Sequence, residues 1–130
     1  MIRPLTALDR DAAVALWHAT GLTRPWNDPY ADFDRAQAVL GAFDGDELIG
    51  TAMVGHDGHR GWVYYLGVDP KQRGKHLGRA LMAACEAWVR ERGIPKIQVM
   101  VRGDNAATRG FYEALGYTLD DVVVYSRRFS

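Results

Sequence analysis

The clearest constraint on the fold is the segment from Leu77 to Val89, in which apolar residues recur at helical spacing. They stand three and four positions apart, at Leu77, Ala80, Leu81, Ala84, Cys85, Trp88 and Val89. This spacing predicts an amphipathic helix with one apolar face, and Gly93 and Pro95 are expected to end it. Such a helix needs a sheet or a second helix to cover that face.

Shorter signals on either side predict an alternation of strands and helices. Strands are expected at residues 1–5, at 41–56 in two parts around Asp44-Gly45, at 61–68 and 96–101, and as a pair within 117–129. Helices are expected after Asp9, around residues 30–40, and after Asp104 or Asn105. The chain is therefore expected to form one domain, residues 1–130, of the α/β (α+β) class, with a mixed sheet and helices on both faces.

Composition narrows the function classes. Sixteen basic residues balance sixteen acidic ones, so the net charge does not favour nucleic acid as a partner. No apolar run approaches the roughly 20 residues that span a bilayer, so no membrane association is expected. The single cysteine, Cys85, falls on the apolar helix face, which is typical of a core residue in a reducing compartment and predicts a cytoplasmic location.

The segment "DPKQRGKHLGRALM", residues 69–82, joins a predicted strand to the amphipathic helix. A helix amino terminus with nearby glycines and basic side chains can hold a phosphate group. From the local pattern alone, a solvated basic turn remains an equal alternative. His76 stands where a phosphate-binding loop would most simply have a third glycine.

Two motifs in the right order resemble the GNAT N-acetyltransferases. Arg73 to Gly78 is similar to the family's pyrophosphate loop, and "NAATRGFYEALGY", residues 105–117, is similar to its later helix. Within that family, the chain resembles the YpeA branch, which is related to ribosomal-protein amino-terminal acetyltransferases. His76 and Thr108 depart from the family pattern. The resemblance implies a mostly antiparallel sheet, splayed at its fourth and fifth strands, with acetyl-CoA bound at the splay.

The resemblance also implies roles for individual residues. The free N–H of Leu66 is expected to stabilise the oxyanion and Tyr112 to protonate the leaving thiolate, while Gly67 suits a bulge that forces the splay. The implied cofactor-binding residues are Leu66, Val68, Arg73, Gly74, Lys75, His76, Leu77, Gly78, Arg79, Asn105 and Tyr112. No metal site is expected, because the turn that carries His56 and His59 lacks a third ligand.

The acceptor is expected to be an amine bound beside residues 24–30. Candidate substrate residues are Trp26, Asn27, Asp28 and one of Tyr64 and Tyr65, since neighbours alternate across a strand. The strand expected at residues 61–68 carries no acidic residue. Candidate bases that could take the proton of the amine are therefore Asp57, His59, Asp28 or a water. A weakly basic α-amine at a peptide or protein amino terminus is therefore favoured over a small amine, with a non-catalytic acetyl-CoA sensor or partner subunit as the alternative function. The sequence leaves a monomer and a homodimer equally open.

Overall fold

The computed structural model describes residues 1–129. They divide into two compact units, residues 1–100 and residues 101–129.

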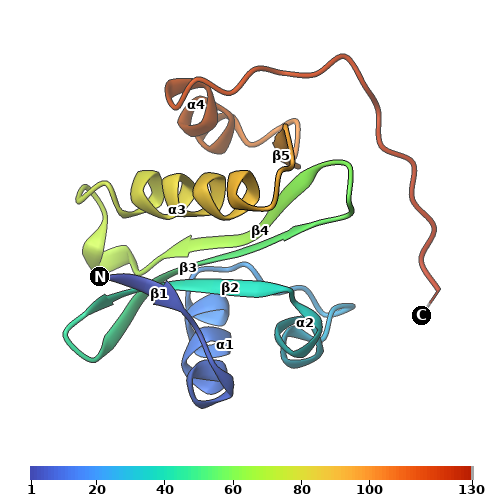
Figure 1. Cartoon of the computed structure of the whole chain (residues 1–130). Coiled ribbons are helices and arrows are strands. Elements are labelled where there is room, and N and C mark those ends of the chain that lie inside the picture. Colours follow the sequence, from blue (N-terminus) through green and yellow to red (C-terminus); the bar gives the residue numbers. More distant parts are fainter. Residues whose placement is uncertain (130) are drawn as a thin grey trace. The chain divides into compact units, whose positions relative to one another are not determined.

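The first unit is built on a five-stranded sheet in the order β1-β2-β3-β4-β5 (Figure 1). The strands are β1 (Ile2–Pro4), β2 (Ala38–Asp44), β3 (Glu47–His56), β4 (Gly61–Val68) and β5 (Ile97–Val99). Neighbours are antiparallel except for β4 and β5, which are parallel. The expected mixed, mostly antiparallel sheet is thereby confirmed.

Helices cover both faces of this sheet. The helices α1 (Arg10–Ala19) and α2 (Pro29–Arg35) lie on one face and α3 (Leu77–Glu91) on the other, as Figure 1 shows. Two short turns of 3₁₀-helix, η1 (Ala7–Asp9) and η2 (Pro70–Gln72), precede α1 and α3. The buried residues of α3 are Leu81, Met82, Cys85 and Val89. The amphipathic helix predicted from the spacing of its apolar residues is confirmed.

The close approach of α3 to the sheet depends on glycine. A Cβ placed on Gly61 would lie 2.6 Å from a methyl group of Val89, and one on Gly50 would lie 3.0 Å from a methyl group of Leu81. Both contacts are at or inside the limit of real packing distances, so a side chain at either position would push the helix away from β3 and β4.

The second helix is shorter than the sequence indicates. The pattern from Phe33 to Leu40 predicts a helix, but α2 ends at Arg35, and Val39 and Leu40 are buried on β2. The strand β2 pairs with both β1 and β3, and this long-range pairing outweighs a local helical spacing.

The sheet opens between β4 and β5. Their pairing runs from Gly61 to Val63 on β4, so beyond Val63 this edge of β4 has no strand partner within residues 1–129. The strand β4 has a β-bulge at Tyr65 and Leu66. These two residues lie between the registered pairs Thr51↔Gly67 and Met53↔Tyr64, where β3 has a single residue. Tyr65 has a φ of +52°, a left-handed conformation that is uncommon for a bulky residue.

The splay expected between the fourth and fifth strands is therefore confirmed, but the bulge expected at Gly67 is not. Gly67 stays in register with Thr51. Its missing side chain instead makes room for the loop after α1, because a Cβ there would lie 2.8 Å from Leu22 Cδ1.

The second unit contains α4 (Ala106–Ala114), and the strand pair expected within residues 117–129 does not form. Val122, Val123, Val124 and Tyr125 are instead exposed. Their composition suits a strand, but Asp120-Asp121 lacks the glycine that favours a tight hairpin turn.

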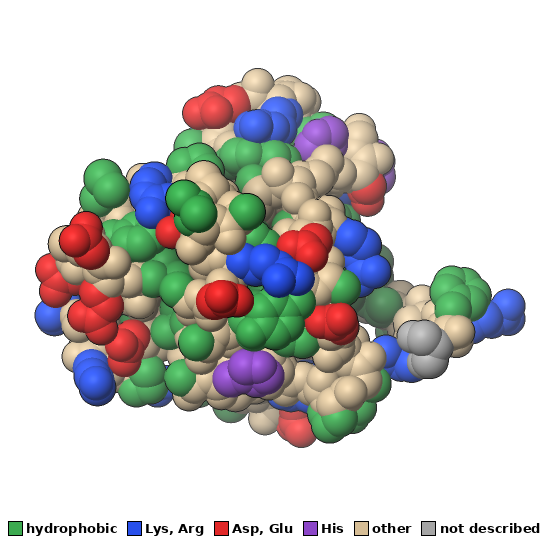
Figure 2. All heavy atoms as spheres, turned by 90° about the horizontal axis from the view of Figure 1, so that it is seen from below, with side chains coloured by type: hydrophobic (Ala, Val, Ile, Leu, Met, Phe, Trp, Pro, Cys, Tyr) green, Lys and Arg blue, Asp and Glu red, His purple; other side chains and the backbone are tan. Residues whose placement is uncertain are grey.

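Charges of both signs are mixed over the face that carries α1 and α2, where acidic and basic side chains alternate with apolar ones (Figure 2). Within residues 1–129 no helix is both long and apolar enough to cross a bilayer.

Candidate functional site

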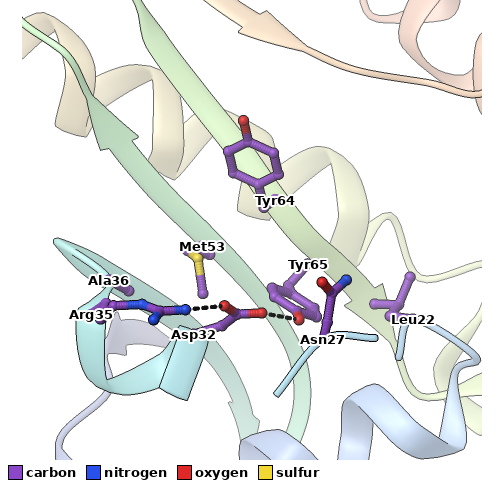
Figure 3. A pocket seen from close by; sticks show the side chains of 8 residues that line it. All are labelled: Leu22, Asn27, Asp32, Arg35, Ala36, Met53, Tyr64 and Tyr65. Carbon is purple, nitrogen blue, oxygen red and sulfur yellow. Dashed lines mark hydrogen bonds and ion pairs between the residues drawn. The ribbon is translucent and has the colours of Figure 1, made fainter. Parts of the chain in front are cut away.

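A cavity of about 500 Å³ lies where β4 faces α2 and the loop after α1 (Figure 3). It is lined by Leu22, Asn27, Asp32, Arg35, Ala36, Met53, Tyr64 and Tyr65. Leu22, Ala36 and Met53 supply apolar surface, while Asn27, Asp32, Arg35 and the two phenols supply polar groups. Such a combination of apolar surface and a few converging polar groups is typical of a site that binds a small molecule.

Tyr65 is the most firmly held side chain of this cavity. Its ring stacks on Trp17, with centroids 4.0 Å apart and planes 15° apart, and its hydroxyl donates to Oδ2 of Asp32 over 2.6 Å. Burial, together with the carboxylate of Asp32, raises the pKa of Tyr65. The phenol therefore stays protonated at neutral pH and acts as a hydrogen-bond donor.

Asp32 is a site residue that the sequence did not reveal. Its Oδ1 accepts from Nη2 of Arg35 at 3.0 Å, so each carboxylate oxygen already has one donor (Figure 3). In sequence, Asp32 and Arg35 look like an ordinary ion pair three residues apart on an exposed helix face. Only the contact with Tyr65, 33 residues away, identifies the carboxylate as part of the cavity.

Of the residues expected to bind the acceptor, Asn27, Tyr64 and Tyr65 line the cavity. The expectation that only one tyrosine could do so was wrong, because the left-handed conformation of Tyr65 interrupts the alternation of β4. Asp28 instead caps α2, accepting from the N–H groups of Tyr30 and Ala31. Trp26 is 52% exposed and is not among the lining residues.

The candidate base Asp57 belongs to a structural turn. Its carboxylate accepts from the backbone N–H groups of Arg60 and His59 and from the indole of Trp62. These bonds lower its pKa from 3.8 to about 2, which makes it a poor proton acceptor at neutral pH. Neither Asp57 nor His59 lines the cavity.

The loop between β4 and α3 has the features of an anion site. Gly74 and His76 have positive φ values, +85° and +58°, and the first N–H groups of α3, from Leu77 to Arg79, find no acceptor within the described residues. A helix amino terminus of this kind attracts negative charge.

The side chains of the loop add free positive charge. No carboxylate of residues 1–129 forms an ion pair with Lys71, Arg73 or Arg79, and Lys75 donates to the neutral amide of Gln72 at 2.8 Å. The basic charge of the loop is thus available to a ligand.

His76 caps α3 in the left-handed conformation, with a φ of +58° and a ψ of +26°, and its side chain makes no capping bond. A residue with a Cβ loses roughly 1–2 kcal/mol in this conformation.

In the second unit, Asn105 rather than Asp104 caps α4, accepting from the N–H of Thr108 at 3.1 Å. Tyr112 is the buried residue of this helix. Its ring contacts Phe111 and Tyr117, with centroids 5.0 and 5.6 Å away.

In sequence and in fold, the chain is similar to known acetyltransferases. Residues 3–117 match the model of the acetyltransferase (GNAT) family. An acetyltransferase of Pectobacterium atrosepticum is 42% identical over 125 residues, which are 92% of this chain and 89% of the relative. Another, from Sodalis glossinidius, is 43% identical over 121 residues, covering 89% and 85% of the two chains.

Two solved structures share the fold. A ribosomal-protein-alanine N-acetyltransferase of Brucella melitensis superposes with a TM-score of 0.79 at 23% identity, covering 100% of this chain and 99% of the other. An aminoglycoside N-acetyltransferase in complex with CoA superposes with a TM-score of 0.83 at 19% identity, covering 98% and 93%.

Proposed function

Because the chain belongs to the GNAT family of acetyltransferases, we propose that it acetylates the α-amine at a peptide or protein amino terminus. The reaction class is acetyl-CoA-dependent N-acetyl transfer, and acetyl-CoA is the acetyl donor. The observation that supports a peptide-end acceptor is the cavity of about 500 Å³ against β4. A cytoplasmic location is part of the proposal.

Acetyl-CoA fits the residues of the first unit. The open edge of β4 beyond Val63 offers backbone groups to the amide-rich arm of the cofactor. The N–H groups of Leu77 to Arg79 and the side chains of Lys71 and Arg73 would meet its diphosphate. Val68, Gly74, Lys75, His76 and Gly78 complete the proposed site on this loop, and Asn105 is proposed to contribute from the second unit.

The reaction proceeds by direct attack in a ternary complex. The amine nitrogen attacks the thioester carbonyl, whose π electrons move onto oxygen, and the proposed donor to this oxyanion is the N–H of Leu66. Collapse of the tetrahedral intermediate breaks the C–S bond. Tyr112 is proposed to protonate the departing thiolate, because a phenol with a pKa near 10 can transfer a proton to a thiolate in a concerted step.

The acceptor class follows from the cost of deprotonating the amine. At pH 7 a lysine side chain loses its proton at a cost of roughly 4.6 kcal/mol, whereas an α-amine requires only about 1.4 kcal/mol. The structure offers little base catalysis. β4 carries no acid, Asp57 is held ionised in a turn and Asp28 caps a helix. In the cavity, both oxygens of Asp32 already accept hydrogen bonds from Tyr65 and Arg35. An amine of low pKa needs least help, and water can remove its proton.

The proposal is tested by measuring release of the CoA thiol from acetyl-CoA with a panel of amines. We expect release with amino-terminal peptides, and a fall in kcat of about 10²-fold in Tyr112→Phe. Tyr125→Phe is the matched control, because Tyr125 is exposed, and it should leave kcat unchanged. Binding of acetyl-CoA without thiol release on any amine would instead identify a cofactor sensor.

A further inference from the structure

Thr51 is a polar residue buried in the middle of the sheet, with 0% of its surface exposed. Its hydroxyl accepts from Nε1 of Trp17 at 2.8 Å and donates to the backbone carbonyl of Tyr65 at 2.9 Å. Both functions of the hydroxyl are therefore used, and its proton is directed at one carbonyl. Trp17 is equally buried, so the bond from the indole to the hydroxyl is shielded from water, while the bond from the hydroxyl to the Tyr65 carbonyl is part-buried.

The carbonyl of Tyr65 and the N–H of Leu66 belong to the same peptide group. No peptide bond among residues 1–129 is cis, and in a planar trans peptide the C=O and N–H bonds point in opposite directions. A hydroxyl that fixes the Tyr65 carbonyl on one side therefore fixes the direction of the Leu66 N–H on the other side, away from Thr51.

No group of β3 is placed to accept a hydrogen bond from the N–H of Leu66. Thr51 and Met53 are the β3 residues in register with β4 on either side of the bulge. Ala52, between them, has no register partner on β4, and the Leu66 N–H points away from Thr51, which holds the carbonyl of the same peptide. Since pairing with β5 ends at Val63, the Leu66 N–H faces an open strand edge.

We propose that Thr51, oriented by Trp17, is a positioning residue that holds and polarises the Tyr65–Leu66 peptide for acetyl transfer. The inference rests on the proposed function, in which the Leu66 N–H meets the oxyanion of the thioester. A hydrogen bond into the carbonyl draws electron density from the amide nitrogen, so the N–H of the same peptide becomes a stronger donor. These two hydrogen bonds also hold Tyr65 in its left-handed conformation before substrate arrives, so no reorganisation is needed during the reaction.

Steady-state kinetics provide the first test. Thr51→Val deletes the hydroxyl at nearly constant volume, and we expect kcat to fall about tenfold while KM for acetyl-CoA stays within about twofold. Thr51→Ser keeps the hydroxyl and should recover kcat to within about threefold of the wild type. Thr6→Val, which deletes a hydroxyl that accepts from Leu8 N–H at the start of η1, is the control and should leave kcat unchanged.

A kcat for Thr51→Val within twofold of the wild type, in a protein that unfolds cooperatively in urea, overturns the proposal. If Thr51→Val does not fold, Thr51→Cys replaces it, because a thiol is a much weaker donor than a hydroxyl. Equal kcat values for Thr51→Cys and the wild type would contradict the proposal in the same way.

Infrared spectra of bound acetyl-CoA labelled with ¹³C at the thioester carbonyl separate this inference from the proposed function. We expect the carbonyl stretch to move to lower frequency on binding to the wild type, and to move less in Thr51→Val. The same shift in both proteins would overturn the role of Thr51 alone. If the wild type shifts the band but acetylates no amine, the proposed function fails while the spectrum still reports the effect of Thr51. No shift in the wild type would overturn both Leu66 as the donor and Thr51 as its positioning residue.

Discussion

The phenol of Tyr65 donates to the carboxylate of Asp32 over 2.6 Å and so joins β4 to α2. Replacing Tyr65 by Phe keeps the ring that stacks on Trp17 and removes only this bond. We expect the free energy of unfolding, measured with urea, to fall by about 1 kcal/mol. Tyr64→Phe is the control, because the Tyr64 hydroxyl bonds to no group within residues 1–129, and it should change stability by less than about 0.5 kcal/mol. Equal effects of the two substitutions would argue against the bond.

His76 holds a left-handed conformation that glycine adopts without strain. We expect His76→Gly to raise the free energy of unfolding by up to about 1 kcal/mol, and to change the affinity for CoA, measured by calorimetry, by less than about threefold. His76→Val should destabilise the protein, because a β-branched side chain is poorly tolerated there. A tenfold loss of affinity in His76→Gly would show that the imidazole itself binds the cofactor.

Gly78 lies in the first turn of α3, where a side chain would stand between the backbone and a bound diphosphate. We expect Gly78→Val to raise KM for acetyl-CoA by about tenfold or more, with little change in KM for the amine. Ala83→Val introduces the same side chain on the exposed part of α3 and should leave both constants unchanged. Equal increases in both KM values for Gly78→Val would count against a diphosphate site.

The hairpin turn after β3 depends on ionised Asp57. Its pKa of about 2 in the folded protein lies below its ordinary value of 3.8, so its contribution to stability is complete above the ordinary value and is lost as the pH falls through about 2. The difference in Tm between the wild type and Asp57→Asn should therefore shrink on acidification from about pH 5 to about pH 2. Asp46→Asn, which removes a carboxylate with no hydrogen-bond donor in the described structure, is the control. A pH-independent difference for Asp57→Asn would contradict the assignment.

Local patterns were sufficient for most of the fold. The spacing from Leu77 to Val89 predicted α3 because a helix brings residues three and four positions apart onto one face, so its pattern is visible within a short stretch of sequence. The motifs at Arg73–Gly78 and Asn105–Tyr117 led to the family. Where stability depends on distant partners, the local pattern misled, as at Val39 and Leu40, which pair on β2, and in the final segment, whose residues suit strands that do not form.

The candidate site was harder to predict for a related reason. Asp32 is recognised as part of the cavity by its hydrogen bond to Tyr65, which lies far from it in the sequence. The bulge at Tyr65 depends on a left-handed backbone conformation that is unfavourable for this residue type. Thr51 gave no sequence signal, because a threonine in a strand is ordinary. Its hydroxyl gains significance from two distant partners, which lie 34 residues before it and 14 residues after it.

The central claim, acetyl transfer to an α-amine, is tested most directly by a peptide that carries both a free amino terminus and one lysine. After incubation with the protein and acetyl-CoA, fragmentation mass spectrometry locates the acetyl group. We predict acetylation of the α-nitrogen, at an initial rate at least about tenfold above that at the lysine ε-nitrogen, because the α-amine is far cheaper to deprotonate. Acetylation mainly at the lysine, or none at either nitrogen above the rate without protein, would contradict the claim.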